Sequence, residues 1–149
     1  MKIIKDKYDY CFYGGGGYVP IIKGNITKNN FLIKKKNTKI KFKSFLIDHG
    51  HIKASAYVFE KIAYLSDCNG IDKKYYKNLR NLKFLIIDSL KMNEHPSHFN
   101  LDQTLELVKE LKPKKTILTN LANDIDYKKV QKFLPKNVKP AFDGMNFLI

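Results

Sequence analysis

Apolar and polar residues alternate through the first half of the chain, most clearly between Phe31 and Ile47, where positions 39–43 read Lys-Ile-Lys-Phe-Lys. A period of two is typical of a β-strand, and it places the lysines on one face and the apolar side chains on the other. Residues 8–13, 55–60 and 61–65 also read as strands, and the four glycines at 14–17 predict a loop. We therefore expect a mainly antiparallel sheet here, with its lysine face in solvent.

The second half alternates predicted strands with predicted helices. Strands are expected at 84–87 and 116–118, and the helix between them begins after Asn100, a residue suited to cap a helix N-terminus. The apolar stripe of this helix consists of Leu101, Leu105, Val108 and Leu111. A shorter helix is expected at 127–133, before Pro135, and two short final strands are expected beside the turn at 143–144. The second half is thus predicted to be α/β, with the stripe in its core.

Length and composition narrow the class of protein. The 149 residues suit one domain, 44% of them are hydrophobic, and no stretch approaches the roughly 20 apolar residues that cross a bilayer. The first nine residues lack the apolar segment of a signal peptide, and Cys11 and Cys68 match neither a disulfide framework nor a CxxC metal motif. We expect reduced thiols, a cytoplasmic location and no membrane association.

The net charge of +14 raises the question of a nucleic-acid partner, because basic surfaces attract phosphates. Almost all of the positive charge is lysine, and Arg80 is the only arginine, whereas recognition of bases and bidentate binding of phosphate favour arginine. A solvated lysine surface is therefore the favoured interpretation, and nucleic-acid binding stays open as the alternative.

Polar residues with ligand chemistry follow the predicted strands directly. They are His49, Asp67, Asp88 and Asn120. Because strand ends in α/β sheets gather side chains from different segments around one pocket, a shared site is plausible there. His49 could bind a metal through one ring nitrogen or lie hydrogen-bonded at the surface. Asp67 could bridge two cations or cap the turn that follows it.

Two more candidate residues, His95 and His98, lie on the loop directly before the helix that begins after Asn100. The start of a helix favours anions. A histidine with a pKa near the working pH can donate a proton to a leaving oxygen or steady a phosphoryl group. The alternative is a solvent-exposed loop without a catalytic role.

Seven short motifs follow one another in a particular order. They are Asp-His-Gly-His (48–51), Ala-Tyr-Leu-Ser-Asp (63–67), Leu-Ile-Ile-Asp-Ser-Leu (85–90), His-Pro-Ser-His-Phe (95–99), Ile-Leu-Thr-Asn (117–120), Asp-Ile-Asp-Tyr (124–127) and Pro-Ala-Phe-Asp-Gly-Met (140–145). In this order they resemble the phosphodiesterase-like branch of the metallo-β-lactamase superfamily, and they are similar to the cyclic-phosphate phosphodiesterases of phosphonate degradation. The resemblance covers the chain from about Phe42 to Ile149.

The resemblance implies a role for each candidate residue. His49 would be a metal ligand, Asp67 the carboxylate that bridges two metals, and His98 the active-site histidine near the scissile phosphate. It implies hydrolysis of a phosphodiester or cyclic phosphate, in which a hydroxide acidified by two cations attacks phosphorus while His98 assists the leaving group. Zinc or manganese is the expected metal.

Further positions are assigned in the same way. His95, Asp88 and Asp143 are expected around the metals or on the substrate side. Asn120 falls where the family has its last ligand histidine, although some members of this branch also have asparagine there, and an amide oxygen is a poor ligand for zinc. We therefore expect Asn120 to be a weak ligand at best.

The family's defining His-x-His-x-Asp-His motif does not occur in this sequence. Since that motif lies in the N-terminal half of the family fold, the resemblance implies that residues 1–149 form a single partial domain. This domain would be the α/β C-terminal half of an αββα sandwich, with an antiparallel or mixed sheet flanked by helices. Half a sandwich would expose an apolar sheet face. We expect a separately encoded N-terminal half or a second copy as the partner, or else a truncated reading frame.

Two functional hypotheses result. The first is the C-terminal segment of a metal-dependent hydrolase, an enzyme by family, which acts on a phosphate-ester small molecule and is inactive without its other half. The second is a non-catalytic remnant or a basic module that binds nucleic acid, which the net charge of +14 and the absent ligands favour.

Overall fold

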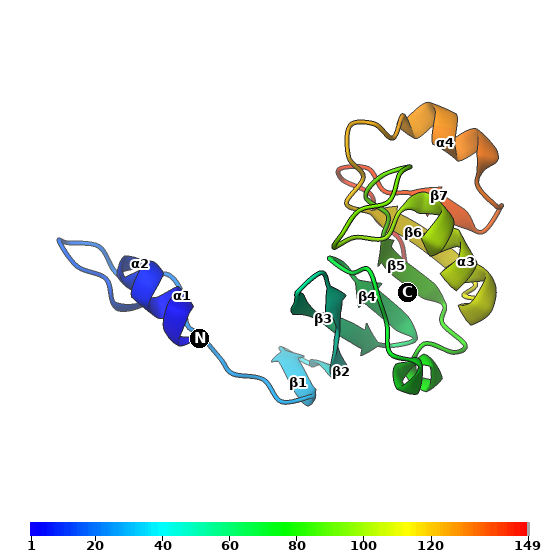
Figure 1. Cartoon of the computed structure of the whole chain (residues 1–149). Coiled ribbons are helices and arrows are strands. Elements are labelled where there is room, and N and C mark those ends of the chain that lie inside the picture. Colours follow the sequence, from blue (N-terminus) through cyan, green and yellow to red (C-terminus); the bar gives the residue numbers. More distant parts are fainter. Residues whose placement is uncertain (149) are drawn as a thin grey trace.

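The structure is a computed structural model that describes residues 1–148, and its main feature is a mixed sheet of seven strands (Figure 1). The strands lie side by side in sequence order: β1 (Asn30–Lys35), β2 (Thr38–His49), β3 (Ile52–Phe59), β4 (Ile62–Leu65), β5 (Phe84–Asp88), β6 (Lys115–Thr119) and β7 (Val138–Pro140). Neighbours from β1 to β4 are antiparallel, and neighbours from β4 to β7 are parallel. The antiparallel first half and the α/β second half are both confirmed.

The alternating pattern between Phe31 and Ile47 forms a hairpin rather than one strand. β1 and β2 are joined by a tight turn in which Lys36 has a left-handed backbone, at φ 50°. β2 then continues for 12 residues to His49. The lysines at 39, 41 and 43 are exposed as predicted, whereas Phe45 and Ile47, farther along the same face of β2, are buried.

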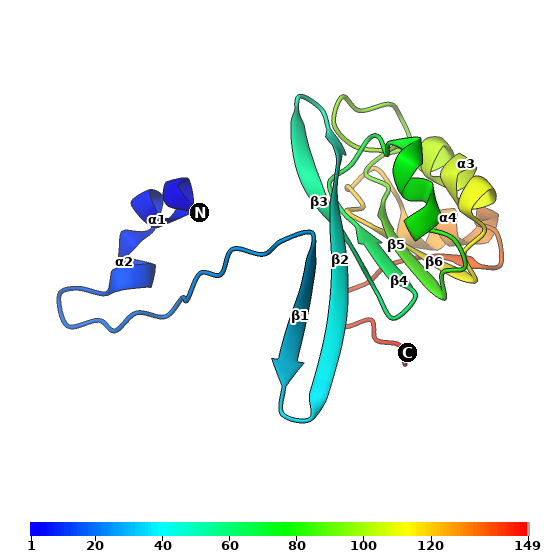
Figure 2. The same ribbon diagram turned by 90° about the horizontal axis from the view of Figure 1, so that it is seen from below.

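Three helical segments connect the parallel strands: η1 (Lys73–Asn78), α3 (Leu101–Leu111) and α4 (Tyr127–Phe133). The strand order advances in one direction, and such crossovers are right-handed, so all three segments lie on the same face of the sheet (Figure 2). The hydrophobic core lies between this face and the helices. It includes Leu65 and Ile87 from the sheet and Leu107 and Val130 from the helices.

The opposite face of the sheet also carries apolar side chains. Leu46 on β2 is 55% exposed, and Tyr64 on β4 is 40% exposed. Within residues 1–148 no helix covers this face (Figure 2). The C-terminal tail covers one end of it, because Phe147 stacks on Phe84 with ring centroids 4.4 Å apart. An apolar sheet face therefore stays open in the described part of the chain.

Helix α3 begins where its capping sequence predicts. The side chain of Asn100 accepts the backbone N–H of Gln103, and the side chain of Gln103 accepts the backbone N–H of Asn100. This reciprocal capping box satisfies two of the N–H groups that a helix start leaves without partners. Leu101, Val108 and Leu111 are buried as predicted. The cap also fixes the end of the loop that carries the two candidate histidines.

Two predicted strands are wrong. Residues 8–13 contain helix α2 (Asp9–Tyr13), which follows α1 (Lys2–Lys7). No neighbouring strand is available to pair with this segment, so its backbone groups bond locally. After β7 and the turn at Asp143, residues 145–148 form no strand, because the tail is held through the ring of Phe147 and not through a backbone ladder.

Residues 1–29 form an arm that extends away from the sheet (Figures 1 and 2). Helices α1 and α2 contact each other, and the carbonyl oxygen of Cys11 accepts the N–H groups of Ile21 and Ile22. The predicted loop at 14–17 is confirmed as a turn within this arm. No helix among residues 1–148 combines the length and the apolar character that crossing a bilayer requires.

Candidate metal centre

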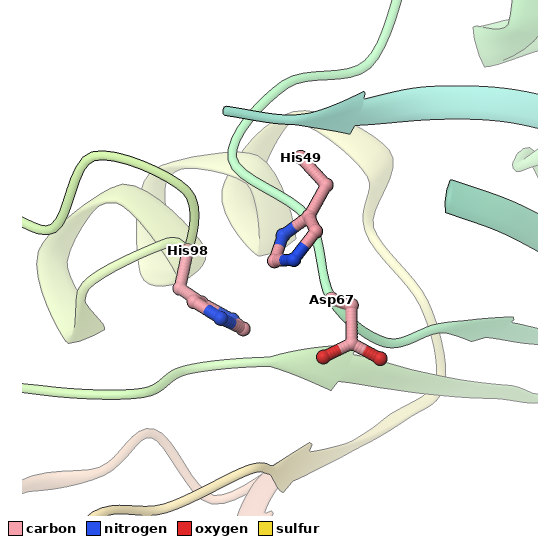
Figure 3. A group of neighbouring side chains, drawn as sticks. All are labelled: His49, Asp67 and His98. Carbon is pink, nitrogen blue, oxygen red and sulfur yellow. The ribbon is translucent and has the colours of Figure 1, made fainter. Parts of the chain in front are cut away.

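Three side chains from separate segments converge where the strands β2 and β4 end (Figure 3). His49 ends β2, Asp67 follows β4, and His98 lies on the loop before α3. One potential ligand atom from each residue lies within 4.8 Å of those from the other two. The rings of His49 and His98 meet edge to face, with centroids 4.7 Å apart. The structure therefore brings together the three residues on which the predicted site depends.

Backbone contacts fix the ring of His49. Its Nδ1 atom lies 2.8 Å from the carbonyl oxygen of Ser97. A carbonyl can only accept, so Nδ1 carries the proton and Nε2 keeps a free lone pair. Gly50 follows at φ +59°, and a Cβ atom on it would lie 3.0 Å from the Cβ of Ser97. Glycine in the Asp-His-Gly-His motif therefore lets the β2–β3 turn approach the loop that carries His98.

A buried carboxylate orients His98. Its Nδ1 atom lies 2.5 Å from Oδ2 of Asp88, and the same oxygen accepts the backbone N–H of Cys68 at 2.8 Å. Asp88 has no exposed surface. Burial is the largest influence on it and raises the pKa of its carboxyl group, while the two hydrogen bonds act in the opposite direction. With Nδ1–H donated to Asp88, the Nε2 atom of His98 remains for the site.

Asp67 and Asn120 share an unusual backbone conformation. Both lie in the left-handed region, at φ 55° and 60°, just after β4 and β6. Such conformations cost about 1–3 kcal/mol each and often occur at functional sites. The Nδ2 atom of Asn120 donates to Oδ1 of Asp67 at 3.2 Å and to Oγ of Ser66 at 3.1 Å. Asn120 therefore holds the carboxylate in place, and the nitrogen that does so cannot also bind a metal.

Asn69 is a further site residue, one that is not among those predicted from the sequence. Its Oδ1 atom accepts the backbone N–H of Gly50 at 3.1 Å, and its Nδ2 atom donates to the carbonyl oxygen of Pro96 at 2.9 Å. Asn69 thus links the turn after His49 to the loop that carries His98. The only signal in the sequence is its position two residues after Asp67, which does not mark it as a bridge.

His95 and Asp143 lie around the three-residue cluster. The ring centroid of His95 lies 5.1 Å from that of His98, and its Nδ1 atom accepts the backbone N–H of Ser97 at 3.3 Å. Asp143 and Asn120 line the same surface groove. Both positions suit the substrate side of the site, and that role stays a prediction.

The donor set suits a divalent cation. Imidazole nitrogens and carboxylate oxygens are ligands of zinc and manganese. Ligands about 2.0–2.2 Å from a tetrahedral zinc lie roughly 3.4 Å from one another, so atoms that lie within 4.8 Å of one another must close by up to about 1.4 Å to bind it. Three ligands match one catalytic zinc with an open position, but they do not hold a metal pair. If His98 is kept for proton transfer, only His49 and Asp67 remain.

A family model for the beta-lactamase superfamily domain matches residues 3–119, and the chain therefore belongs to this family. The match includes the whole cluster of His49, Asp67 and His98. Proteins of the metallo-β-lactamase fold are metal-dependent, which agrees with the chemistry of these three side chains.

Solved structures share the fold. A diphosphatase from the PhnP family matches with a TM-score of 0.82 and 26% identity, over 97% of this chain and 52% of its own. The metallo-beta-lactamase fold protein YhfI from Bacillus subtilis matches with a TM-score of 0.67 and 15% identity, over 86% of this chain and 56% of its own. Human tRNase Z, short form, matches with a TM-score of 0.55 and 20% identity, over 78% of this chain and 46% of its own. The fold is the metallo-β-lactamase fold, and the chain spans about half the length of these proteins.

One curated relative is an acyltransferase by name. An octanoyltransferase from Porphyromonas gingivalis is 24% identical over 105 residues, which make up 69% of this chain and 21% of that protein. The chain thus spans about a fifth of this relative. The three clustered side chains are two histidines and an aspartate, and no serine, cysteine or lysine is among them.

Proposed function

We propose that this chain is part of a metal-dependent hydrolase that cleaves a phosphodiester or a cyclic phosphate. The observation that carries the proposal is the convergence of His49, Asp67 and His98, in which hydrogen bonds at Nδ1 leave the Nε2 atoms of both rings for the site. The likeness to a diphosphatase at 26% identity supports phosphorus chemistry. The metal is expected to be zinc or manganese, because both accept nitrogen and oxygen ligands.

His49 and Asp67 are the proposed metal ligands. A divalent cation bound there supplies the Lewis acidity that activates water and stabilises the charge developing on a phosphoryl group. The carbonyl of Ser97 fixes the tautomer of His49, and the amide of Asn120 fixes the carboxylate of Asp67. Partners of this kind commonly contribute 10–100-fold to metal affinity or activity.

His98 is proposed as the general acid. A protonated imidazole can give its Nε2 proton to a leaving oxygen while Nδ1–H stays bonded to Asp88. The buried carboxylate then faces the positive charge of the ring and keeps the ring oriented. His95, with its ring 5.1 Å from that of His98, is proposed to border the substrate.

We further propose that residues 1–149 are a partial domain that works with a segment carrying His-x-His-x-Asp-His. Two observations support this. The cluster offers at most three ligands within residues 1–148, and the sheet face around Leu46 and Tyr64 is open. A second copy of this chain would cover the open face without adding that motif. A segment with the motif would supply the missing ligands and cover the open sheet face.

The test combines genomic sequence with an assay. The DNA immediately upstream is searched for a frame that encodes His-x-His-x-Asp-His, and its product is purified together with this chain. Hydrolysis of bis(p-nitrophenyl) phosphate and of 2′,3′-cyclic AMP is measured with Zn²⁺ or Mn²⁺, with His98→Gln as the variant. Activity of the pair that falls at least about 100-fold in the variant supports the proposal. If the upstream region lacks such a frame, the proposal of a two-piece enzyme is wrong. If the purified pair is inactive, the proposal of a hydrolase is wrong.

A further inference from the structure

The β1–β2 hairpin extends beyond the part of the sheet that the helices cover (Figure 2), and lysines line one of its faces. The register pairs Lys34 with Lys39 and Leu32 with Lys41, so these side chains share a face. Positions two apart on a strand lie about 7 Å from each other. Lys34, Lys39 and Lys41 are all exposed, and we call them the lysine row.

The lysine row has little compensating charge. The 38 residues from 10 to 47 contain eight lysines and no Asp or Glu. Among residues 1–148, the salt bridges of lysine involve Lys53, Lys74 and Lys129 but no lysine of the hairpin. The carboxylate of Glu60 lines a groove together with Lys41 but forms no salt bridge with it. The row therefore presents net positive charge to solvent.

Lys34 and Lys39 are direct cross-strand partners. Like charges placed opposite each other on a sheet destabilise it. The hairpin holds them together through its other face, where the rings of Phe31 and Phe42 stack with centroids 5.1 Å apart and Phe59 lies 4.6 Å from Phe42. An anion between the two lysines would remove their repulsion.

The positive surface continues from the hairpin onto the helical side. Lys43, on the same face as the lysine row, donates a hydrogen bond to Oδ1 of Asn78 at 2.6 Å, at the end of η1. Asn78 lies next to Lys77 and two residues before Arg80, and both of these are exposed. The positive charges are thus arranged along a line from the hairpin to the end of η1. This arrangement suits a ligand whose negative charges repeat at regular intervals.

We propose that the lysine row binds the phosphate backbone of a nucleic acid without reading its sequence. A linear polyanion matches an extended row of single positive charges, whereas one small phosphate ester would meet only one or two of them. Lysine acts as a point charge, which suits contacts to phosphate and provides little base recognition. This surface lies far along β2 from His49 and does not depend on the proposed hydrolase.

The test measures binding of a fluorescein-labelled single-stranded RNA 20-mer and of a DNA duplex of matching sequence by fluorescence anisotropy. The triple variant K34Q/K39Q/K41Q is compared with K109Q/K128Q/K132Q, which removes the same charge from exposed positions on α3 and α4. Circular dichroism verifies that both variants are folded.

The hairpin variant is expected to bind RNA at least about tenfold more weakly at low salt, with the slope of log K against log[salt] reduced by roughly 2 for three lost contacts. The helix variant should stay within a factor of about 3. Equal losses of RNA affinity in both variants would mean that binding depends only on net charge, and this result would overturn the proposal. So would the absence of binding by the wild type, or tighter binding to phosphatidylserine vesicles than to either nucleic acid.

Discussion

The Nδ1 atom of His98 lies 2.5 Å from Oδ2 of Asp88, a carboxylate without exposed surface that also accepts the backbone N–H of Cys68. This contact decides which nitrogen of His98 carries the proton and which one is left for chemistry. Because the two residues are ten positions apart, the end of β5 and the loop before α3 must both form before the ring is oriented.

Asp88→Ala should release the tautomer of His98. Oδ2 of Asp88 lies at Nδ1 of His98 and also accepts the backbone N–H of Cys68, so the variant removes the acceptor that holds the proton on Nδ1. A larger share of the rings should then carry the proton on Nε2, which loses its free lone pair. Two-bond ¹H–¹⁵N spectra report the tautomer directly and independently of activity. An unchanged spectrum in a folded variant would contradict the assigned role of Asp88.

The purified chain is expected to hold well under one tightly bound zinc or manganese ion. His49, Asp67 and His98 are the only cluster of His, Cys, Asp and Glu ligands that residues 1–148 offer. Mass spectrometry of the metal content after gel filtration provides the measurement, with His49→Ala as the matched control that should lower the content further. Stoichiometric binding of two metals would show that the site is complete without another segment.

Asn120→His should raise the affinity for zinc by at least about tenfold. Its side chain already lies within hydrogen-bonding distance of Asp67, and an imidazole at that position would add a nitrogen ligand to the cluster. Competition with a fluorescent zinc chelator measures the change. Asn120→Gln controls for the loss of the native contact, and a histidine variant no better than the glutamine variant would place position 120 outside the reach of the metal.

Substitution of Leu46 and of Ile47, which are neighbours on β2, should affect the stability of the protein to very different extents. Leu46→Glu on the open face should change the free energy of unfolding by no more than about 0.5 kcal/mol. Ile47→Ala on the helix-covered face, where the side chain is 1% exposed, should cost about 2–5 kcal/mol. Urea unfolding followed by circular dichroism compares the two. Comparable losses would mean that Leu46 is covered by something in this protein, for example a second copy.

Much of the sheet domain could be predicted from local sequence. The alternation along β2 and the capping residues of α3 determine structure over a few positions, and the structure follows both. The segment 8–13 reads as a strand by the same criterion, yet a strand needs a neighbour to pair with. Its sequence could not reveal that the arm has none, and α2 forms instead.

The candidate site was predictable where its residues end strands and was not predictable where backbone atoms or single bridges complete it. The positions of His49 and Asp67 after two strands indicated a common pocket. The carbonyl of Ser97 and the side chain of Asn69 leave no pattern in the sequence, because their contacts join segments 19 or more residues apart. The donor role of Asn120 toward Asp67 likewise depends on three-dimensional proximity.

β2 carries two residues of the lysine row and a candidate metal ligand on one continuous strand, with Lys39, Lys41 and His49 all at odd-numbered positions. Because side chains of a strand alternate with a period of two, deleting one residue between Lys41 and His49 would turn the imidazole toward the wrong face. Losing two residues would preserve its direction but draw it back by about 7 Å. Insertions and deletions should therefore be tolerated at the hairpin tip and rejected within the strand.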